Sequence, residues 1–210
     1  MACVLLAACN DDNTTPTTPG EGNDSASTTR ASEKKDWIPV DSAMEMKAWM
    51  ENATPAEAHK MMAKSDGKWK GESTMWPSDG GTPSKSSIEM TNKMIMGGRY
   101  QQTTIKGDMM GMPIEGLATT AFDNQSKKYE STWIDNLGTG IMKMQGTYDP
   151  SSKTYTYNGK MTNPANGLEC DFKQVFKIID DDNEIMEMYG PDPKTGKQFK
   201  NSEIKLTRVK

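Results

Sequence analysis

The stretch Gly67-Lys68-Trp69-Lys70-Gly71-Glu72-Ser73-Thr74-Met75 decides the fold class, because here the sequence pattern acquires a period of two. Small or apolar residues at the odd positions alternate with charged or polar residues at the even ones. Successive side chains of a β-strand point to opposite faces, so the pattern predicts a strand with one buried and one solvated face. Different patterns precede and follow this strand, and they define the organisation of the chain.

About nine further segments with strand character follow, separated by turns rich in Gly, Pro, Asp, Asn or Ser. Short strands at hairpin spacing are typical of an up-and-down antiparallel sheet. Closing such a sheet removes its exposed edges, and about ten strands leave room for an internal cavity. We therefore predict a mainly β domain at 67–210, an antiparallel barrel of about ten strands. The predicted strands are 67–75, 88–96, 99–106, 114–122, 128–135, 141–148, 154–161, 168–178, 185–189 and 199–209.

Residues 37–66 have a largely helical pattern and form the predicted cap of the barrel. Within them, Thr54-Pro55-Ala56-Glu57 has the composition of a helix start. Thr is a good capping residue, Pro suits the first helical position, and Glu three residues after Thr completes a capping box. We expect a helix to begin at this point, just before the barrel.

The first nine residues, 1–9, are apolar and end in Leu6-Ala7-Ala8-Cys9. This ending resembles the lipobox of bacterial lipoproteins. The resemblance implies that 1–9 is a signal remnant, that Cys9 is lipidated, and that Cys9 becomes the mature N-terminus. The basic region that opens a signal peptide is missing, so we expect the true start to lie upstream.

Residues 10–36 contain mostly Asn, Asp, Thr, Pro, Gly and Ser and almost no apolar side chain. Such a segment cannot bury enough surface to offset the entropy lost on ordering, which predicts a disordered tether. With Cys9 as its anchor, the tether predicts a cell-envelope protein, lipid-anchored to a bacterial membrane on its periplasmic or cell-surface side. No stretch approaches the length of a transmembrane helix, so we expect membrane contact through the lipid anchor only.

Composition excludes several function classes. The net charge is −4, and no basic cluster offsets it, which argues against a nucleic-acid partner. The chain has one histidine, His59, so clusters of histidines around a metal are excluded. Of three cysteines, only Cys170 lies outside the first nine residues, which leaves the body of the protein without an internal disulfide. Methionine is unusually frequent at 18 of 210 residues, and its flexible side chain fills irregular apolar space.

Trp69 and Arg208 support closure of the predicted barrel. Trp69 falls on the inward face of the first strand, and Arg208 shares a face with Ile204 and Leu206 on the last strand. Closure puts these strands side by side, where an Arg can stack on a Trp ring. Gly67-Lys68-Trp69 together with Arg208 resembles the signature of lipocalins and their calycin relatives.

A wider set of motifs follows in order over residues 54–208. Together these motifs resemble the bacterial family known as domain of unknown function 1579, which is thought to be calycin-like. The resemblance implies a barrel fold and brings no activity with it. The motifs are Thr54-Pro55 with His59-Lys60, Gly67-x-Trp69-x-Gly71, Gly97-Gly98-Arg99-Tyr100, Gly111-Met112-Pro113-x-Glu115-Gly116, Phe122-Asp123-Asn124, Trp133-Ile134-Asp135-Asn136-x-Gly138-Thr139-Gly140, Met186-Glu187-Met188-Tyr189 and Thr207-Arg208.

Several polar and aromatic residues are candidates for contacting a ligand in the cavity. Gly97-Gly98 allows a sharp turn that would aim Arg99 inward, toward Glu115 and Asp135. Such residues would fix a polar head group while Met and aromatic side chains hold an apolar tail. The alternative is a buried, paired set of charges that fixes strand register. The candidate cavity residues are Arg99, Glu115, Trp133, Asp135, Tyr155 and Tyr157.

Trp133 and Asp135 also have a structural alternative. Asp at a strand end readily bonds turn backbone, and Gly138 and Gly140 permit unusual dihedral angles. His59 offers acid–base chemistry or haem ligation, as in some other calycin-type barrels. The alternative for His59 is a helical residue that bonds a backbone group or plugs one barrel end.

Metal sites receive little support from the sequence. Repeated Met-x-Met pairs put two thioethers on one strand face, and thioethers suit Cu(I), but the pairs are scattered and Met is a common apolar filler. Asp180-Asp181-Asp182-Asn183 lacks the spacing of a calcium loop and predicts a hairpin turn. Cys170 predicts a core thiol. We expect no catalytic residue, no metal and no cofactor.

Three functions remain open from the sequence. The first is an exported lipoprotein that binds a small, partly apolar or amphipathic molecule in the barrel. The second is an enzyme, a hydrolase or isomerase, that uses acidic cavity residues such as Glu115 with His59 or Asp135. The third is a structural or interaction lipoprotein with a filled barrel and exposed aromatics at Trp37, Trp49 and Trp76.

Overall fold

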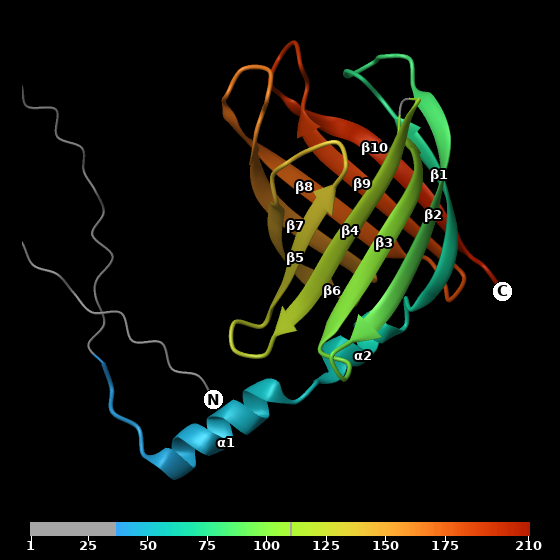
Figure 1. Cartoon of the computed structure of the whole chain (residues 1–210). Coiled ribbons are helices and arrows are strands. Elements are labelled where there is room, and N and C mark those ends of the chain that lie inside the picture. The colour runs from blue at the N-terminus through green and yellow to red at the C-terminus, as the bar shows by residue number, and fades with distance from the viewer. Residues whose placement is uncertain (1–36, 110) are drawn as a thin grey trace, which may run out of the picture. The chain divides into compact units, whose positions relative to one another are not determined.

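The computed structural model describes residues 37–109 and 111–210. Residues 40–210 form one compact unit (Figure 1). The expected signal remnant at 1–9 and tether at 10–36 lie outside the described residues. The described part contains α1 (Ser42–Ala53), α2 (Glu57–Ala63), β1 (Gly67–Met75), β2 (Ser84–Ile95), β3 (Tyr100–Met109), β4 (Met112–Asp123), β5 (Lys128–Asp135), β6 (Met142–Asp149), β7 (Thr154–Thr162), β8 (Glu169–Ile178), β9 (Asn183–Pro191) and β10 (Gln198–Arg208).

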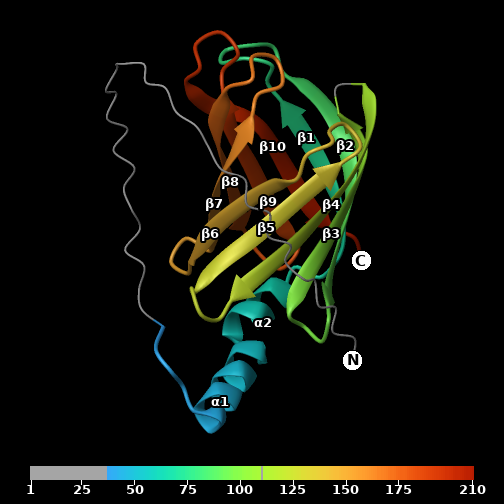
Figure 2. The same ribbon diagram turned by 60° about the vertical axis from the view of Figure 1, so that its left-hand side comes forward.

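The strands form one closed antiparallel barrel. Each strand pairs with its neighbours in sequence, and β1 also pairs with β10, which closes the sheet (Figures 1 and 2). Closure leaves no strand edge unpaired in this sheet. The prediction of a mainly β, up-and-down barrel of ten strands with a short N-terminal helical segment is confirmed.

The alternation in β1 sets which side chains face the interior. Trp69, Gly71 and Ser73 are buried, and the charged residues between them are exposed. At Gly71 an added Cβ would lie 2.5 Å from Cγ1 of Ile88 on β2, so only glycine fits there. The inward face of β1 therefore carries large side chains and, at Gly71, a point where the backbone packs directly against Ile88.

Trp69 and Arg208 form the seam where the barrel closes. The two residues are paired in register between β1 and β10, and the Arg208 guanidinium lies 4.2 Å from the centroid of the Trp69 ring. Arg208 also donates from Nη2 to the carbonyl of Lys64 and from Nε to the carbonyl of Asp181, at 2.8 Å each. The predicted stacking is confirmed, and the same side chain fastens the segment after α2 to the seam.

Helix α2 lies across one end of the barrel (Figures 1 and 2). Its N-cap residue is Ala56, whose N–H donates to Nδ1 of His59 at 2.9 Å. Burial lowers the pKa of His59, which favours the neutral imidazole that accepts this bond. The predicted capping by Thr54 is wrong, because Thr54 ends α1 and its Oγ1 donates to the carbonyl of Met50.

A buried polar network joins this closed end to the strands. The carbonyl of Ser65 accepts from Nε1 of Trp69 at 2.9 Å and from Nδ2 of Asn92 at 3.1 Å. Ser65 Oγ donates to Glu184, which is only 3% exposed, at 3.1 Å. Burial raises the pKa of Glu184 to about 7, although the hydrogen bond from Ser65 and the charge of Arg208 oppose the shift.

Helix α1 makes little contact with the barrel. None of its residues is buried, and Met46, Trp49 and Met50 are exposed. Asn124 Nδ2 donates to the carbonyls of Asn52 and Thr54, at 3.0 and 2.9 Å, which attaches the end of the helix to the β4–β5 turn. Neither helix among the described residues is long and apolar enough to cross a membrane.

Candidate functional site

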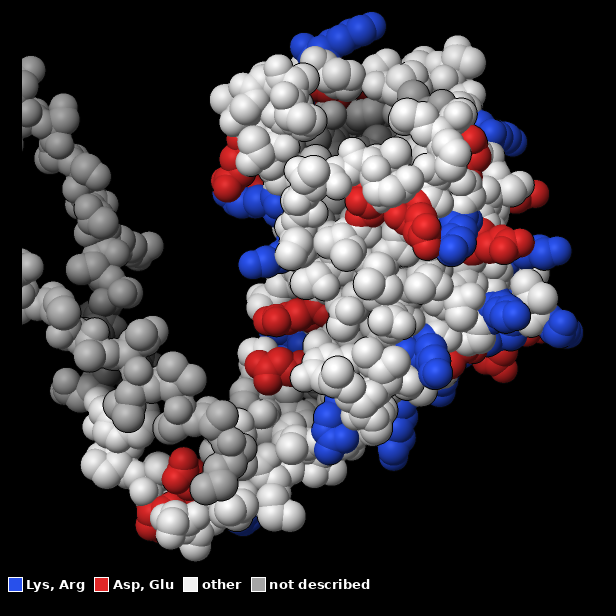
Figure 3. All heavy atoms as spheres, in the orientation of Figure 1, with Lys and Arg blue, Asp and Glu red and all other residues white. Residues whose placement is uncertain are grey.

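The barrel encloses a cavity of about 530 Å³. Its inner end is formed by Met61, Met62 and Ser65 of α2 and the residues after it. Trp76 and Pro193, from loops at the opposite end, also line it. Figure 3 shows the molecule hollowed at that end, between the loops that join the strands. The volume is in the range of sites for small molecules, which lie at about 300–1,000 Å³.

The cavity wall is largely thioether and aromatic. Ten of the 18 methionines line it. The Met-x-Met pairs on β6 and β9 each place both thioethers in the wall, whereas Met96 of another pair is 71% exposed. Flexible thioethers adapt to ligands of varied shape, so they suit an apolar binding wall. The methionines are Met61, Met62, Met75, Met90, Met109, Met142, Met144, Met161, Met186 and Met188.

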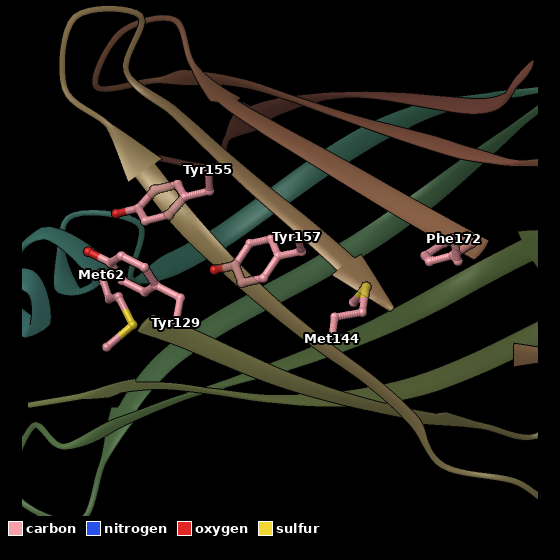
Figure 4. Close-up of a cluster of buried hydrophobic side chains, with 6 residues drawn as sticks. All are labelled: Met62, Tyr129, Met144, Tyr155, Tyr157 and Phe172. Carbon is pink, nitrogen blue, oxygen red and sulfur yellow. The ribbon is translucent and has the colours of Figure 1, made fainter. Parts of the chain in front are cut away.

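Tyr155 and Tyr157 of β7 lie in this wall near the closed end, where Met62 and Tyr129 flank them (Figure 4). Burial is the main cause that raises the pKa of both hydroxyls, so they are neutral donors at ordinary pH. Tyr155 Oη is buried and makes no hydrogen bond of good geometry among the described residues, although the Tyr129 hydroxyl is near enough to affect its pKa. A buried donor without an acceptor is costly, and a ligand acceptor would remove that cost.

Trp133 and Asp135 are brought together at the end of β5, and both line the cavity. Trp133 Nε1 donates to Oδ2 of Asp135 at 2.6 Å, and Oδ1 accepts from the N–H of Leu137 at 2.9 Å. The Trp133 ring lies over Gly116, where an added Cβ would lie 2.0 Å from Cη2. The pair therefore holds the strand end and its turn and also presents surface to the cavity.

The structure places Arg99 and Glu115 outside the cavity. Gly97 and Gly98 do adopt positive φ angles of 67° and 83°, as expected of a sharp turn. However, Arg99 is exposed and donates to the carbonyl of Met96. Glu115 lies on the outer face of β4, where it pairs with Lys106 at 3.0 Å with both side chains 68% exposed. The expectation that these two residues meet Asp135 inside the barrel is corrected.

His59 and Cys170 have structural surroundings. The His59 ring meets Phe122 edge-on at 5.8 Å, and the residue is not among those that line the cavity. This agrees with a helical histidine that bonds backbone and plugs one end. Cys170 is half-buried, and its Sγ lies 3.4 Å from the carbonyl of Met161. Within residues 37–109 and 111–210 no group of three or more His, Cys, Asp or Glu is placed to hold a metal ion.

Sequence reasoning missed Asp108, Asp192 and Glu184. Asp108 is among the lining residues, although the alternation of β3 predicts an outward side chain at this position. Asp192 is 4% exposed and accepts from the N–H groups of Asp79 and Lys194 at 2.9 Å, which ties two loops of the open end together. Glu184 lies on the same face of β9 as Met186 and Met188, so extending the predicted strand 185–189 by one residue would have found it.

A closed up-and-down barrel around an apolar cavity is a lipocalin-like fold. The chain belongs to the family described as "Protein of unknown function (DUF1579)", whose model matches residues 54–208. The expected family is thereby confirmed. A comparison with curated proteins found no match.

Two solved structures have a similar fold. The S-type phycobiliprotein lyase CPES from Guillardia theta matches with a TM-score of 0.53 at 7% identity, over 77% of this chain and 97% of that one. Rv2717c from M. tuberculosis matches with a TM-score of 0.56 at 14% identity, over 75% of this chain and 100% of that one. Identities this low establish a shared barrel fold alone.

Proposed function

We propose that this protein binds or carries a small, partly apolar molecule inside the barrel. The observation that carries the proposal is the cavity of about 530 Å³ with its wall of thioethers and aromatic rings. A barrel that served only as a scaffold would fill its interior with side chains. Trp133, Asp135, Tyr155 and Tyr157 are the proposed contacts, since all four line the cavity.

The test of binding is native mass spectrometry of the domain purified from its own cell type, with organic extraction of what copurifies. We expect a defined mass to accompany the folded domain and to be lost on unfolding. A domain that carries nothing, and that shows no thermal shift with lipids, haem or copper, would contradict the proposal.

The proposal includes a lipid anchor at Cys9 and a place in the cell envelope, facing the periplasm or the cell surface. Its support is the lipobox-like Leu6-Ala7-Ala8-Cys9 and the polar composition of residues 10–36. In a bacterial host, Cys9→Ser should remove the acyl chains and release the protein from the membrane fraction. A variant that still sediments with membranes as the parent does would contradict the proposed lipid anchor.

An enzyme remains the second candidate, because one fold neighbour is named a lyase. The pairs first considered for catalysis do not form, since Glu115 is on the outer face and His59 lies at the closed end. An interaction role is favoured by the exposed Trp49 and Met50 of α1 and by Trp37, which is 85% exposed. Trp76, the third aromatic of that hypothesis, lines the cavity instead.

A further inference from the structure

The charge of the cavity wall is one-sided. Among the described residues that line the cavity, none is Lys, Arg or His, whereas Asp108 and Asp135 both line it. The wall therefore carries two formal negative charges and no positive one. Three lysines near the open end are not part of the lining. Lys194 and Lys197 are exposed loop residues, and Lys200, which lies 5.6 Å from the centroid of the Trp76 ring, pairs with Glu187 and Glu203.

The two carboxylates have limited internal pairing. Asp135 accepts from Trp133 Nε1 and from the N–H of Leu137, and Asp108 Oδ1 accepts from the N–H of Gly111 at 2.7 Å. These donors are neutral, and each carboxylate accepts about four hydrogen bonds when all its lone pairs are used. None of the ion pairs among the described residues involves either carboxylate. Both groups thus keep acceptor positions open for a ligand.

An anionic head group would bind weakly in this cavity. It would leave water without gaining a cationic partner, and it would face two carboxylates of the same sign. A cationic head group would gain the Asp135 carboxylate as a partner and lie beside the Trp133 ring, while its apolar tail lies among the thioethers.

We propose that the cavity selects cationic amphiphiles, molecules with an amine or quaternary ammonium head and an apolar tail, with the head beside Asp135 and Trp133 and with Asp108 as the second acidic residue of the lining. This inference rests on the proposed binding function and specifies its ligand class. It assigns the two carboxylates a role in selecting the ligand by charge.

Three probes with the same decyl chain test the inference: decyltrimethylammonium, decanol and decanoate. Each is titrated against the full chain loaded with the neutral fluorophore N-phenyl-1-naphthylamine, below its micelle concentration. We expect the ammonium probe to displace the fluorophore about ten-fold more tightly than decanol, and decanoate to be the weakest. Decanoate binding as tightly as the ammonium probe, or decanol binding equally, overturns the inference.

Matched variants test whether the two aspartates cause the preference for the ammonium probe. Asp108→Asn and Asp135→Asn should each reduce the ratio of the affinity for the ammonium probe to the affinity for decanol, which is the readout for every variant. Glu115→Gln is the control, because it removes one negative charge from the outer face next to the same strand end. If Asp135→Asn misfolds, Asp108→Asn still decides the matter, since Asp108 has no bond to Trp133.

Failure of the two proposals can be told apart. If the fluorophore and all three probes fail to bind, the binding function itself is contradicted and the charge selectivity falls with it. If the probes bind without regard to charge, or if Glu115→Gln has the same effect as Asp108→Asn, the binding function stands and only the selectivity is wrong.

Discussion

Trp133 has two structural roles: its ring packs over Gly116, and its Nε1 bonds Asp135. The ring therefore stands in the cavity wall at a fixed angle. Only glycine at the facing position on β4 allows this arrangement.

Gly116→Val should displace the Trp133 ring and lower the free energy of unfolding by about 2 kcal/mol, as overpacking of a formed core does. Urea unfolding followed by tryptophan fluorescence measures both the loss and the altered environment of the ring. Gly140→Ala is the matched control, since nothing lies within 4 Å of its added Cβ and its φ is not positive. Equal stability of the two variants would contradict the packing described for Trp133.

Glu184 makes stability depend on pH. Burial raises its pKa from 4.5 to about 7, so the folded state holds a proton that the unfolded state releases. Its contribution to stability is fully present below about pH 4.5 and is lost as pH rises to about 7. Glu184→Gln should therefore be more stable than the parent at pH 8, by up to about 3 kcal/mol.

Chemical denaturation at pH 4.5 and pH 8 provides the test for Glu184. The parent and the Gln variant should differ little at the lower pH and clearly at the higher one, because Gln keeps the acceptor for Ser65 and never ionises. Exposed Glu130→Gln serves as the control on β5. A stability difference between parent and variant that is the same at both pH values would show that Glu184 does not titrate in this range.

At the residue scale the sequence predicted some cavity contacts and not others. Tyr155, Tyr157, Trp133 and Asp135 follow from the period of two. Glu115 lies between Ile114 and Gly116, both buried, so alternation alone already put it on the outer face. Arg99 was misplaced because positive φ angles after a strand permit a turn without fixing where the next side chain points.

At the scale of elements, the seam between β1 and β10 depends on a planar cation. Arg208 lies over the Trp69 ring and donates to carbonyls of Lys64 and Asp181. Arg208→Lys keeps the charge and loses the fork of donors, and should lower the free energy of unfolding by about 2 kcal/mol. Thermal unfolding measures this, with exposed Lys205→Ala on the same strand as the control. Equal melting of both variants would contradict the role given to the seam.

The two helices should differ sharply in their effect on stability. Removing residues 1–49, which takes most of α1, should change the free energy of unfolding by about 0.5 kcal/mol or less, because α1 buries nothing. Met62→Ala in α2 should cost about 3 kcal/mol, since Met62 is 4% exposed and packs on the inner tyrosines. Urea unfolding of both proteins checks the order. A larger loss from the truncation would mean that α1 supports the barrel.

Strand positions were predictable because alternation and turn residues are local signals. The start of α2 was not predictable in this way, because Thr54 ends the preceding helix and bonds the carbonyl of Met50. The capping position fell to Ala56, and His59 supplied the acceptor that a Ser or Thr cap usually supplies. Competing local interactions of similar strength are not resolved by composition.

At the scale of the whole molecule, closure was predictable from Trp69 and Arg208, and the family from the order of its motifs. The cavity volume was not, since it depends on how far side chains from all the strands fill the interior. The one-sided charge of the wall was hidden for the same reason. Asp108 enters the lining through the irregular end of β3, which alternation does not show.

The central claim is that a ligand enters the barrel, and the adjacent threonines of β3 test it most directly. Thr103 lines the cavity, whereas Thr104 is exposed on the outer face. The measurement is a fluorescence titration of N-phenyl-1-naphthylamine into the parent, Thr103→Phe and Thr104→Phe, each shown to unfold cooperatively. The account predicts one site per chain in the parent and in Thr104→Phe, and affinity reduced at least about ten-fold in Thr103→Phe. Equal affinity of all three proteins would contradict binding inside the barrel.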